Sequence, residues 1–236
     1  MSAIIAMCAY CTEENGKEKY LIQSLDSLKA TVNFDKHKLI VINNGMDVKC
    51  LHQDWFTLIE PGQNLGTARG INLALKGREG GQPFIKCDDD WATDHVGWVD
   101  EMERVLTEHP EIGILGLKRD DVYGELIEDG ELLFNHDIMG TCTMYQPSML
   151  DRVGYLYQPS GQYGYDDVIM SVRSEVAGFR NAFMKNIRIT NLDTGGTVYT
   201  EWKKREAGVY MQEVSILCDM YRNGTLDVYW DGGFEG

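Results

Sequence analysis

The chain has 236 residues, 43% of them hydrophobic, so it is long enough to form one globular domain with a sizeable core. Its 5 prolines and 25 glycines exclude a fibrous chain and a disordered one. The formal net charge of −15 disfavours binding to nucleic-acid backbones and anionic membranes, but it leaves room for a local basic cluster that holds a phosphate.

The sequence predicts a cytoplasmic protein without a transmembrane segment. The apolar N-terminus is short, lacks a basic leader and is followed by Glu13 and Glu14, which is unlike a signal peptide. The other apolar runs are too short to cross a bilayer. The 6 cysteines show no paired framework, which favours a reduced, intracellular compartment.

Strand-like and helix-like stretches alternate through the first half of the chain. We expect a strand where a short apolar or β-branched run ends at a turn signal, and a helix where apolar residues recur at spacings of three and four. These criteria predict strands over 4–10, 38–42, 55–59, 84–87 and 112–117, and helices over 17–30, 67–76 and 96–109. The alternation indicates right-handed crossovers and a mainly parallel central sheet flanked by helices.

The second half is less regular than the first. It predicts a loop or hairpin over 120–134, strands over 138–145 and 187–190, and helices over 166–177 and 206–222. An acidic tail rich in aromatic residues and glycine follows. We therefore expect an α/β domain over residues 1–205, with a C-terminal helix and tail over 206–236.

Three consecutive aspartates, Asp88–Asp90, directly follow the predicted strand at 84–87. In open α/β sheets, ligands bind beyond the carboxyl ends of the strands. Adjacent negative charges repel one another unless a cation offsets them, and oxygen ligands suit Mg²⁺ or Mn²⁺. The alternative is a solvated acidic turn that caps the next helix.

A turn containing glycine opens the predicted helix at 67–76, and Arg69 lies in the first turns of that helix. Amide groups at a helix N-terminus attract phosphate, and an arginine nearby adds charge-assisted hydrogen bonds. Such loop-to-helix junctions are also common where no ligand binds, so this motif carries little weight alone.

Asp166 and Asp167 open the predicted helix at 166–177, next to two tyrosines and a glycine. One interpretation is helix capping, because a carboxylate is favourable at the positive end of the helix dipole. The other is that one of the two aspartates acts as a general base.

The order of these motifs resembles family 2 of the GT-A glycosyltransferases, over residues 3–200. The family pattern combines a strand ending near a Tyr, a strand ending in Asp or Asn, an Asn-x-Gly stretch, a DXD-like motif and an acidic pair on a helix that carries Arg. The corresponding pieces here are Met7–Tyr10, Val41–Gly45, Asn64–Asn72, Asp88–Asp90, Met139–Met144, Leu150–Tyr155, Tyr165–Arg173 and Ala177–Arg180.

The resemblance implies the GT-A (nucleotide-diphospho-sugar transferase) fold. It also implies that a sugar passes, with inversion, from a nucleotide-sugar donor to an acceptor hydroxyl, with Mn²⁺ or Mg²⁺ at the donor diphosphate. The sugar, the nucleotide and the oligomeric state stay open. The acceptor is also open between a glycan, a lipid-linked glycan, a protein and a modified nucleic acid base.

The resemblance further assigns roles to acidic residues. Asp167 would be the general base, and Asp166 would position the acceptor or cap the helix. Asp90 would hold the metal with help from Asp88 or Asp89, and Asp88 would contact the ribose. Many relatives carry a histidine after the acidic helix, and Asp193 would replace it as a metal ligand here.

The remaining implied residues surround the donor. Asn191 is the alternative to Asp193 as the replacement for the histidine. The basic cluster Lys203–Arg205 would contact the diphosphate, and Asn43 stands where many relatives have a carboxylate that reads the base. The full set of implied donor-binding residues is Tyr10, Asn43, Asn44, Asn64, Gly66, Arg69, Asp88, Asp89, Lys203 and Arg205.

Two other functions stay open. A sugar-phosphate nucleotidyltransferase would also use an α/β sheet and metal-binding carboxylates, but it usually has an N-terminal glycine-rich loop with a basic residue. Residues 8–17 offer only Gly16 and Lys17 for that role. The second alternative is a non-catalytic nucleotide-sugar-binding protein on the same scaffold, against which the presence of both acidic motifs argues.

Overall fold

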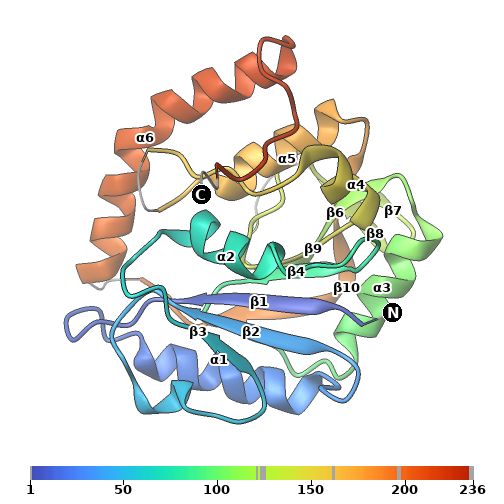
Figure 1. Ribbon diagram of the computed structural model, residues 1–236. Helices are drawn as coiled ribbons and strands as arrows, with labels where there is room; N and C mark the ends of the chain where they lie inside the picture. Colours follow the sequence, from blue (N-terminus) through green and yellow to red (C-terminus); the bar gives the residue numbers. More distant parts are fainter. Residues whose placement is uncertain (1, 121, 123–125, 161–162, 196–197, 234–236) are drawn as a thin grey trace.

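A mixed sheet of ten strands runs through the computed structural model, which describes residues 2–120, 122, 126–160, 163–195 and 198–233 (Figure 1). Across the sheet the strands follow the order β3 (Thr57–Ile59), β2 (Lys38–Asn43), β1 (Ile4–Ala9), β4 (Phe84–Cys87), β9 (Cys142–Tyr145), β6 (Ile112–Arg119), β10 (Arg180–Asn191), β8 (Leu132–Phe134) and β7 (Ile127–Asp129). The short strand β5 (Trp91–Ala92) pairs with β10 away from this path. Segments far apart in the sequence, such as β4 and β9, therefore lie side by side.

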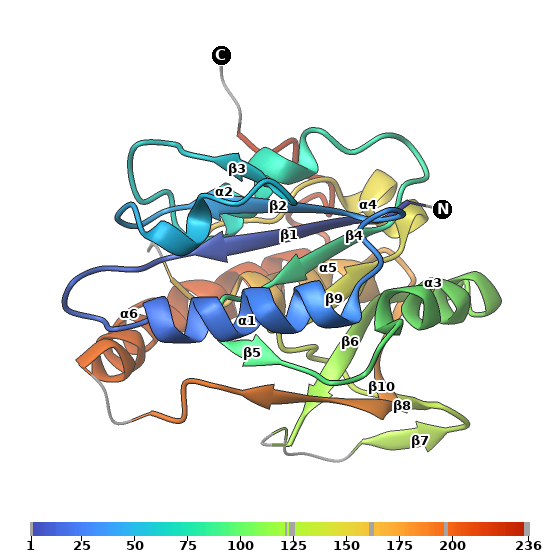
Figure 2. The ribbon, with the colours of Figure 1, turned by 90° about the horizontal axis from the view of Figure 1, so that it is seen from below.

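Most of the strands point the same way, as the alternation of strands and helices predicts. β1 is parallel to both β2 and β4, β2 is parallel to β3, and β6 is parallel to β10. β9 is antiparallel to both β4 and β6, so β6 keeps the direction of β4. The arrowheads of β1, β4 and β10 accordingly point toward the same end of the sheet in Figure 2. Their carboxyl ends form the edge at which α/β sheets bind ligands.

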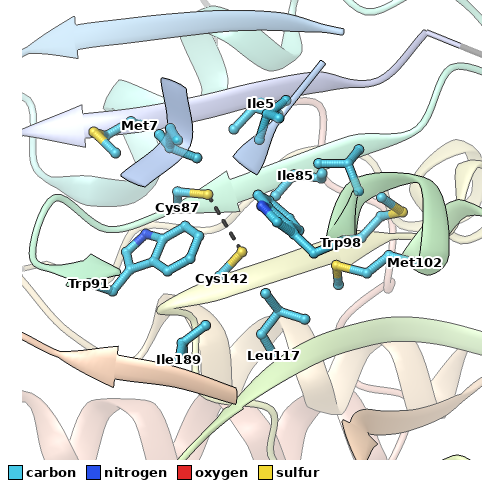
Figure 3. Close-up of a cluster of buried hydrophobic side chains, with 14 of the residues drawn as sticks. Ile5, Met7, Ile85, Cys87, Trp91, Trp98, Met102, Leu117, Cys142 and Ile189 are labelled. Carbon is cyan, nitrogen blue, oxygen red and sulfur yellow. Dashed lines mark hydrogen bonds between the residues drawn. The ribbon is translucent and has the colours of Figure 1, made fainter. Parts of the chain in front are cut away.

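One face of the sheet is covered by α1 (Glu18–Thr31), α3 (Trp98–Glu108) and the short 3₁₀ helix η1 (Lys49–Leu51). Figure 3 shows the core beneath them, in which Trp91 and Trp98 pack edge to face with ring centroids 5.7 Å apart. Trp91 is fully buried and directly follows the loop after β4. Its burial therefore anchors the far end of that loop.

The other face is covered by α2 (Thr67–Leu75), α4 (Pro147–Val153) and α5 (Asp166–Val176), and α6 (Val198–Arg222) packs against α5 (Figure 1). Successive side chains of a strand point to opposite faces, so the central strands β1, β4, β6, β9 and β10 supply both cores. The contact between α5 and α6 contains the buried residues Ile169, Val172, Val214, Cys218 and Tyr221.

The structure differs from the predicted elements mainly in the second half of the chain. α6 begins at Val198, so it runs through the predicted boundary at residue 205. β10 begins at Arg180 and not at 187, because its first part pairs with both β6 and β8. The longer β10 continues the sheet beyond β6 and carries the chain back to the carboxyl edge.

The segment 120–134 forms a hairpin of β7 and β8 where it is described; residues 121 and 123–125 lie outside the described residues. Three elements have no counterpart in the sequence analysis. α4 is a helix of 7 residues that starts with Pro147, β5 has 2 residues, and the 3₁₀ helix η1 has 3. Elements this short show no hydrophobic period, which is why pattern analysis does not find them.

No helix within the described residues has both the length and the apolarity needed to cross a bilayer. The cysteines are all free thiols, including Cys87 and Cys142, whose Sγ atoms lie 3.7 Å apart on neighbouring strands (Figure 3). The fold is therefore held by core packing and hydrogen bonds rather than by disulfides.

Candidate functional site

A polar cavity of about 260 Å³ opens at the carboxyl edge of the sheet, beyond the ends of β1, β2, β4, β6 and β10. The start of α6 forms part of its wall. The residues implied by the sequence that line this cavity are Tyr10, Asn44, Asn64, Gly66, Asp88, Asp89, Asp90, Asn191 and Lys203. Residues from separate parts of the chain thus meet at the place that strand direction predicts.

Two of the three consecutive aspartates share one lysine. Asp89 accepts a hydrogen bond from the Lys17 ammonium and another from the backbone N–H of Tyr10 at 2.9 Å. Lys17 Nζ also lies 3.2 Å from a carboxylate oxygen of Asp90. The side chains of Lys17, Asp89 and Asp90 are only 5%, 4% and 11% exposed. Charges buried this deeply persist only when paired, so Lys17 offsets the repulsion within the triplet.

The loop between β1 and α1 brings Lys17 to this place. Asn15 organises the loop: its side-chain amide donates to the carbonyl of Tyr10 at 2.8 Å, and its side-chain oxygen accepts from the N–H of Thr12 at 3.0 Å and of Lys17 at 3.1 Å. Asparagine side chains stabilise turns through local bonds of this kind. Lys17 is the residue just before α1, and the folded loop holds it beneath the end of β4.

The first aspartate of the triplet faces a different lysine. The Asp88 carboxylate lies 3.3 Å from Lys86 Nζ, and its side chain is 36% exposed toward the cavity. Lys86 Nζ also lies 3.4 Å from the Asp166 carboxylate. One buried ammonium therefore stands between the triplet and the acidic pair.

The acidic pair begins α5 behind the triplet. Asp166 is 5% exposed, and burial raises its pKa to about 6 although the Lys86 ammonium opposes that rise. Asp167 accepts hydrogen bonds from the N–H of Gly140 at 3.0 Å and of Val168 at 2.9 Å. Tyr165, just before the pair, has φ of +65°, a strained conformation for a bulky residue.

Lys203, near the start of α6, joins two carboxylates on the far side of the cavity. Its Nζ lies 3.0 Å from Asp193 and 4.0 Å from Asp90. The neighbouring Trp202 packs against Tyr163 with ring centroids 5.7 Å apart, and both rings line the cavity. The first turns of α6 and the segment before α5 therefore form a side wall made of the Lys203 ammonium group and two aromatic rings.

The asparagine side chains of the site form hydrogen bonds to other groups of the protein. Asn44 donates to the Gly66 carbonyl and the Cys8 sulfur, each at 3.0 Å. Asn64 accepts from the Gly66 N–H at 2.9 Å, and Gly66 has φ of +81°, a value that favours glycine. Asn43 accepts from a backbone N–H two residues ahead and does not line the cavity. These bonds tie the end of β2 to the turn before α2, and a role in reading a base stays a prediction.

Two predicted donor-binding arginines lie outside the cavity lining. Arg69 is exposed, because α2 turns Ala68, Ile71 and Leu75 toward the sheet. The Arg205 side chain is 70% exposed and lies 3.8 Å from its neighbour Glu206. The structure therefore does not bring either guanidinium together with the triplet.

Three basic residues of the site are absent from the sequence-based set. Lys17 and Arg119 line the cavity, and Lys86 lies behind it. Arg119 ends β6 and donates to Thr141 Oγ1 at 3.2 Å. It lies two residues beyond the predicted strand at 112–117, a signal similar to the one that identifies Asp88, so the sequence could have indicated it.

Candidate oxygen ligands for a divalent cation are those of Asp88, Asp90 and Asp193. Asp88 and Asp90 line the cavity, whereas Asp193 is joined to Asp90 through Lys203. Over the part of the chain that the structure describes, these three carboxylates do not converge into a closed ligand group. Mg²⁺ typically takes one or two carboxylates and completes its coordination with substrate phosphates and water. Asp88 and Asp90 fit an ion of this kind.

Another charged cluster lies at the amino ends of the strands. His37 there is close to Asp100 and Glu103. Its Nδ1 accepts from the Ala3 N–H at 3.2 Å, so the neutral ring carries its proton on Nε2, which faces Asp100 at 3.4 Å. A protonated Nε2 has no lone pair for a metal, and Lys36 contacts both carboxylates. We therefore do not assign a metal site here.

Comparison with known proteins supports the fold. No protein-family model and no curated protein sequence matches the chain. Among solved structures, the mannosyltransferase PcManGT from Pyrobaculum calidifontis in complex with GDP-Man and Mn²⁺ is similar with a TM-score of 0.69 and 16% identity, over 93% of this chain and 69% of that one. S. aureus TarS 1–349 is similar with a TM-score of 0.63 and 14% identity, over 92% of this chain and 65% of that one.

A third similar structure is GalNAc-T7 with UDP, GalNAc and Mn²⁺, with a TM-score of 0.64 and 10% identity, over 91% of this chain and 50% of that one. The chain thus spans between half and about two thirds of the length of these proteins. At these identities the likeness shows the fold alone. The chain has the GT-A fold, as the motif order predicts.

Proposed function

We propose that this GT-A chain is a glycosyltransferase that moves a sugar from a nucleotide-diphosphate sugar to an acceptor hydroxyl, with inversion at the anomeric carbon. The observation that carries the proposal is the polar cavity at the carboxyl edge of the sheet, lined by the aspartate triplet together with Lys17 and Lys203. Support also comes from two of the similar structures, one in complex with GDP-Man and Mn²⁺ and the other with UDP, GalNAc and Mn²⁺.

The donor diphosphate would lie among the basic residues of the cavity. Lys17, Lys203 and Arg119 bring three positive charges to one place in a chain whose formal net charge is −15. Charge-assisted hydrogen bonds from such groups are the strong ones in phosphate binding. Tyr10 and Asn44, at the ends of β1 and β2, would flank the nucleoside.

Asp88 and Asp90 would hold Mn²⁺ or Mg²⁺, with Asp193 or Asn191 as a further oxygen donor. When bound, such an ion acts as a Lewis acid that stabilises the charge developing on the diphosphate leaving group. In this structure the Lys203 ammonium offsets charge on Asp90 and Asp193. We therefore expect Lys203 to shift from these carboxylates toward the diphosphate when donor binds.

Asp167 would act as the general base. The acceptor oxygen forms a bond to the anomeric carbon as the bond from that carbon to the diphosphate oxygen breaks, and Asp167 takes the hydroxyl proton. The N–H groups of Gly140 and Val168 hold its carboxylate in one orientation. A positioned base of this kind contributes about 10²–10⁴-fold to the rate. Asp166, buried beside it, would position the acceptor side of the site.

A thermal-shift screen of nucleoside diphosphates and nucleotide sugars, with and without Mn²⁺, tests donor binding. A ligand at about 100 times its dissociation constant adds roughly 2.7 kcal/mol of stability, which such a screen detects. We expect at least one uridine or guanosine nucleotide to stabilise the protein, and more so with Mn²⁺. No stabilisation by any member of the panel would contradict the proposal.

Product analysis then tests the reaction. Release of a nucleoside diphosphate from a nucleotide sugar supports glycosyl transfer, whereas release of pyrophosphate would indicate nucleotidyl transfer. Donor binding with neither product, across a panel of glycan, lipid-linked glycan, protein and modified-base acceptors, would instead indicate a non-catalytic binding protein.

A further inference from the structure

Lys86 is unusual for its place in the sheet. It belongs to β4, a strand of four buried residues between β1 and β9, and it is 3% exposed. Strand alternation places its side chain on the face of Phe84, opposite the core that contains Ile85 and Cys87 (Figure 3). Lysine is almost never fully buried unless it is paired. The groups around its ammonium therefore account for its presence.

Those groups come from both acidic motifs. Lys86 Nζ lies 2.9 Å from the Gly140 carbonyl, 3.3 Å from Asp88 and 3.4 Å from Asp166. The N–H of the same Gly140 donates to Asp167 at 3.0 Å. A Cβ at Gly140 would lie 2.4 Å from the observed position of Lys86 Nζ, so a larger residue would require the ammonium to move. One lysine and one glycine thus connect the strand that bears the triplet with the start of α5.

The charges around Lys86 favour its protonated form. Its Nζ lies within 3.4 Å of the Asp88 and Asp166 carboxylates, and opposite charges this close favour the ammonium form. The Asp166 carboxylate is also buried, and within the described part of the chain Lys86 is its close counter-charge. A buried charge that loses such a partner is strongly unfavourable. Lys86 therefore makes it possible to keep an ionised Asp166 behind the cavity.

We propose that Lys86 is a positioning residue, whose ammonium holds Asp166 and Asp88 in place and so fixes the acidic pair relative to the triplet. The inference rests on the proposed function, in which the triplet serves the donor and the pair serves the acceptor. A glycosyl transfer needs the base and the donor carbon in one geometry, and a misplacement of about 1 Å can cost about 10²-fold in rate. Lys86 sets that geometry without touching either substrate.

A double-mutant cycle tests this proposal with four proteins: wild type, Lys86→Met, Asp166→Asn and the double variant. Lys38→Met, at an exposed position on β2, is the matched control. Three quantities are measured on each protein: the melting temperature, the affinity for UDP and for GDP with Mn²⁺, and the rate of nucleoside diphosphate release from UDP-GlcNAc and GDP-mannose.

For stability, we expect Lys86→Met to lower the melting temperature by about 10 °C, because it leaves Asp166 without its counter-charge. The double variant should be more stable than Lys86→Met alone, because a neutral amide then lies beside the methionine. The double variant also provides a folded protein for kinetics if the single variant is too unstable. If the loss of stability in the double variant equals the sum of the losses in the two single variants, Lys86 and Asp166 are not coupled and the proposal is wrong.

For turnover, we expect Lys86→Met to lower kcat about 10²-fold while nucleotide binding stays close to wild type. The double variant should be no slower than the slower single variant, because Lys86 acts through Asp166. A Lys86→Met protein that is folded at the assay temperature and has wild-type kcat would overturn the proposal. A double variant whose loss in kcat equals the product of the two single-variant losses would also overturn it.

The same data separate this proposal from the proposed function. If wild type releases no nucleoside diphosphate from either donor, the proposed function loses support, and the stability cycle alone decides whether Lys86 and Asp166 are coupled. If wild type is active and Lys86→Met is equally active, the proposed function stands and the role of Lys86 is refuted. Lys38→Met should match wild type in every measurement.

Discussion

The two ends of the parallel strands each carry acidic side chains around a lysine, but the clusters differ in burial. At the amino end, the side chains of the Lys36–Asp100 pair are 36% and 48% exposed. At the carboxyl end, those of the Lys17–Asp89 pair are 5% and 4% exposed. The same residue types therefore form a surface ion pair at one end and a buried one at the other.

This difference shows which cluster needs a functional explanation. Exposed ion pairs typically contribute about 0–1 kcal/mol and are common on protein surfaces. A buried pair is often no more stabilising than an apolar contact of the same volume, because both charges lose their hydration. Stability alone thus does not account for consecutive buried aspartates beside Lys17. The proposed site for a diphosphate and its cation would account for them.

The largest expected effect comes from the proposed base at the carboxyl end. Asp167→Asn should lower turnover about 10²–10⁴-fold, because an amide cannot take the acceptor proton. UDP or GDP binding with Mn²⁺ should be retained, because Asp167 does not line the donor cavity. Steady-state rates and calorimetric binding measure the two quantities. Asp100→Asn, at the amino end, should keep wild-type turnover, and an active Asp167→Asn would refute the assignment of the base.

The comparison of the two lysines can be tested directly by stability. Lys17→Met should cost about 3–5 kcal/mol of unfolding free energy, because it leaves the buried Asp89 carboxylate without its counter-charge. Lys36→Met should cost less, about 0–1 kcal/mol, because Lys36 and Asp100 are 36% and 48% exposed, although the side chain of its other partner, Glu103, is 12% exposed. Chemical denaturation of the two variants and wild type gives both values. Equal losses would mean that the clusters do not differ in the way that their burial indicates.

Removal of the divalent cation should lower the thermal stability of the nucleotide-bound protein through the proposed site at the carboxyl end of the strands. EDTA should abolish the additional stabilisation that Mn²⁺ gives to nucleotide-bound protein, and Asp90→Ala should do the same. At about 100 times the dissociation constant, the full ligand effect is roughly 2.7 kcal/mol. Thermal unfolding with UDP or GDP, with and without Mn²⁺, provides the measurement. Mn²⁺-dependent stabilisation that survives in Asp90→Ala would exclude Asp90 as a necessary metal ligand.

The sequence was sufficient to locate the carboxyl-end site because strand direction follows from the alternation of strands and helices. Asp88, Tyr10 and Asn44 each follow or end a strand, and parallel strands bring such residues to one edge. The helix start at Asp166 was likewise visible from its apolar period and its acidic first turn.

Partners distant along the chain could not be predicted in this way. Lys17 and Asp89 are separated by 72 residues, and no local pattern relates them. Lys86 stands in a short strand, where a polar residue at an alternate position ordinarily indicates a solvent-facing side chain. Its burial depends on α5 and the segment around Gly140 packing over it.

Helix phase explains why basic residues close in sequence separate in space. Lys203 and Arg205 are two residues apart on α6, which turns their side chains about 200° from each other. Lys203 faces the cavity, and the Arg205 side chain is 70% exposed. The basic run Lys203–Arg205 can be recognised from the sequence. Which of its side chains faces the cavity depends on the residue at which α6 begins, and the sequence pattern does not give that residue.

The smallest expected effect lies at the amino end and concerns pH. Burial lowers the pKa of His37, an effect that the nearby Lys36 reinforces and that Glu103 and Asp100 oppose. Between the ordinary histidine pKa of about 6.5 and the lower folded value, the unfolded chain binds more protons than the folded one, so stability falls as pH falls through this window. A tenfold difference in proton affinity between the folded and unfolded chains corresponds to about 1.4 kcal/mol of stability.

His37→Gln should remove this contribution, so the stability difference between wild type and variant should shrink as pH is lowered from 7.5 to 5. Asp166 contributes with the opposite sign, because its raised pKa of about 6 makes stability fall as pH rises from its unfolded value toward neutrality. Both proteins retain Asp166, so subtraction of their denaturation curves cancels that contribution. A stability difference that does not change with pH would mean that His37 is not buried in its neutral form. The interpretation of the charged cluster at the amino end of the sheet would then be wrong.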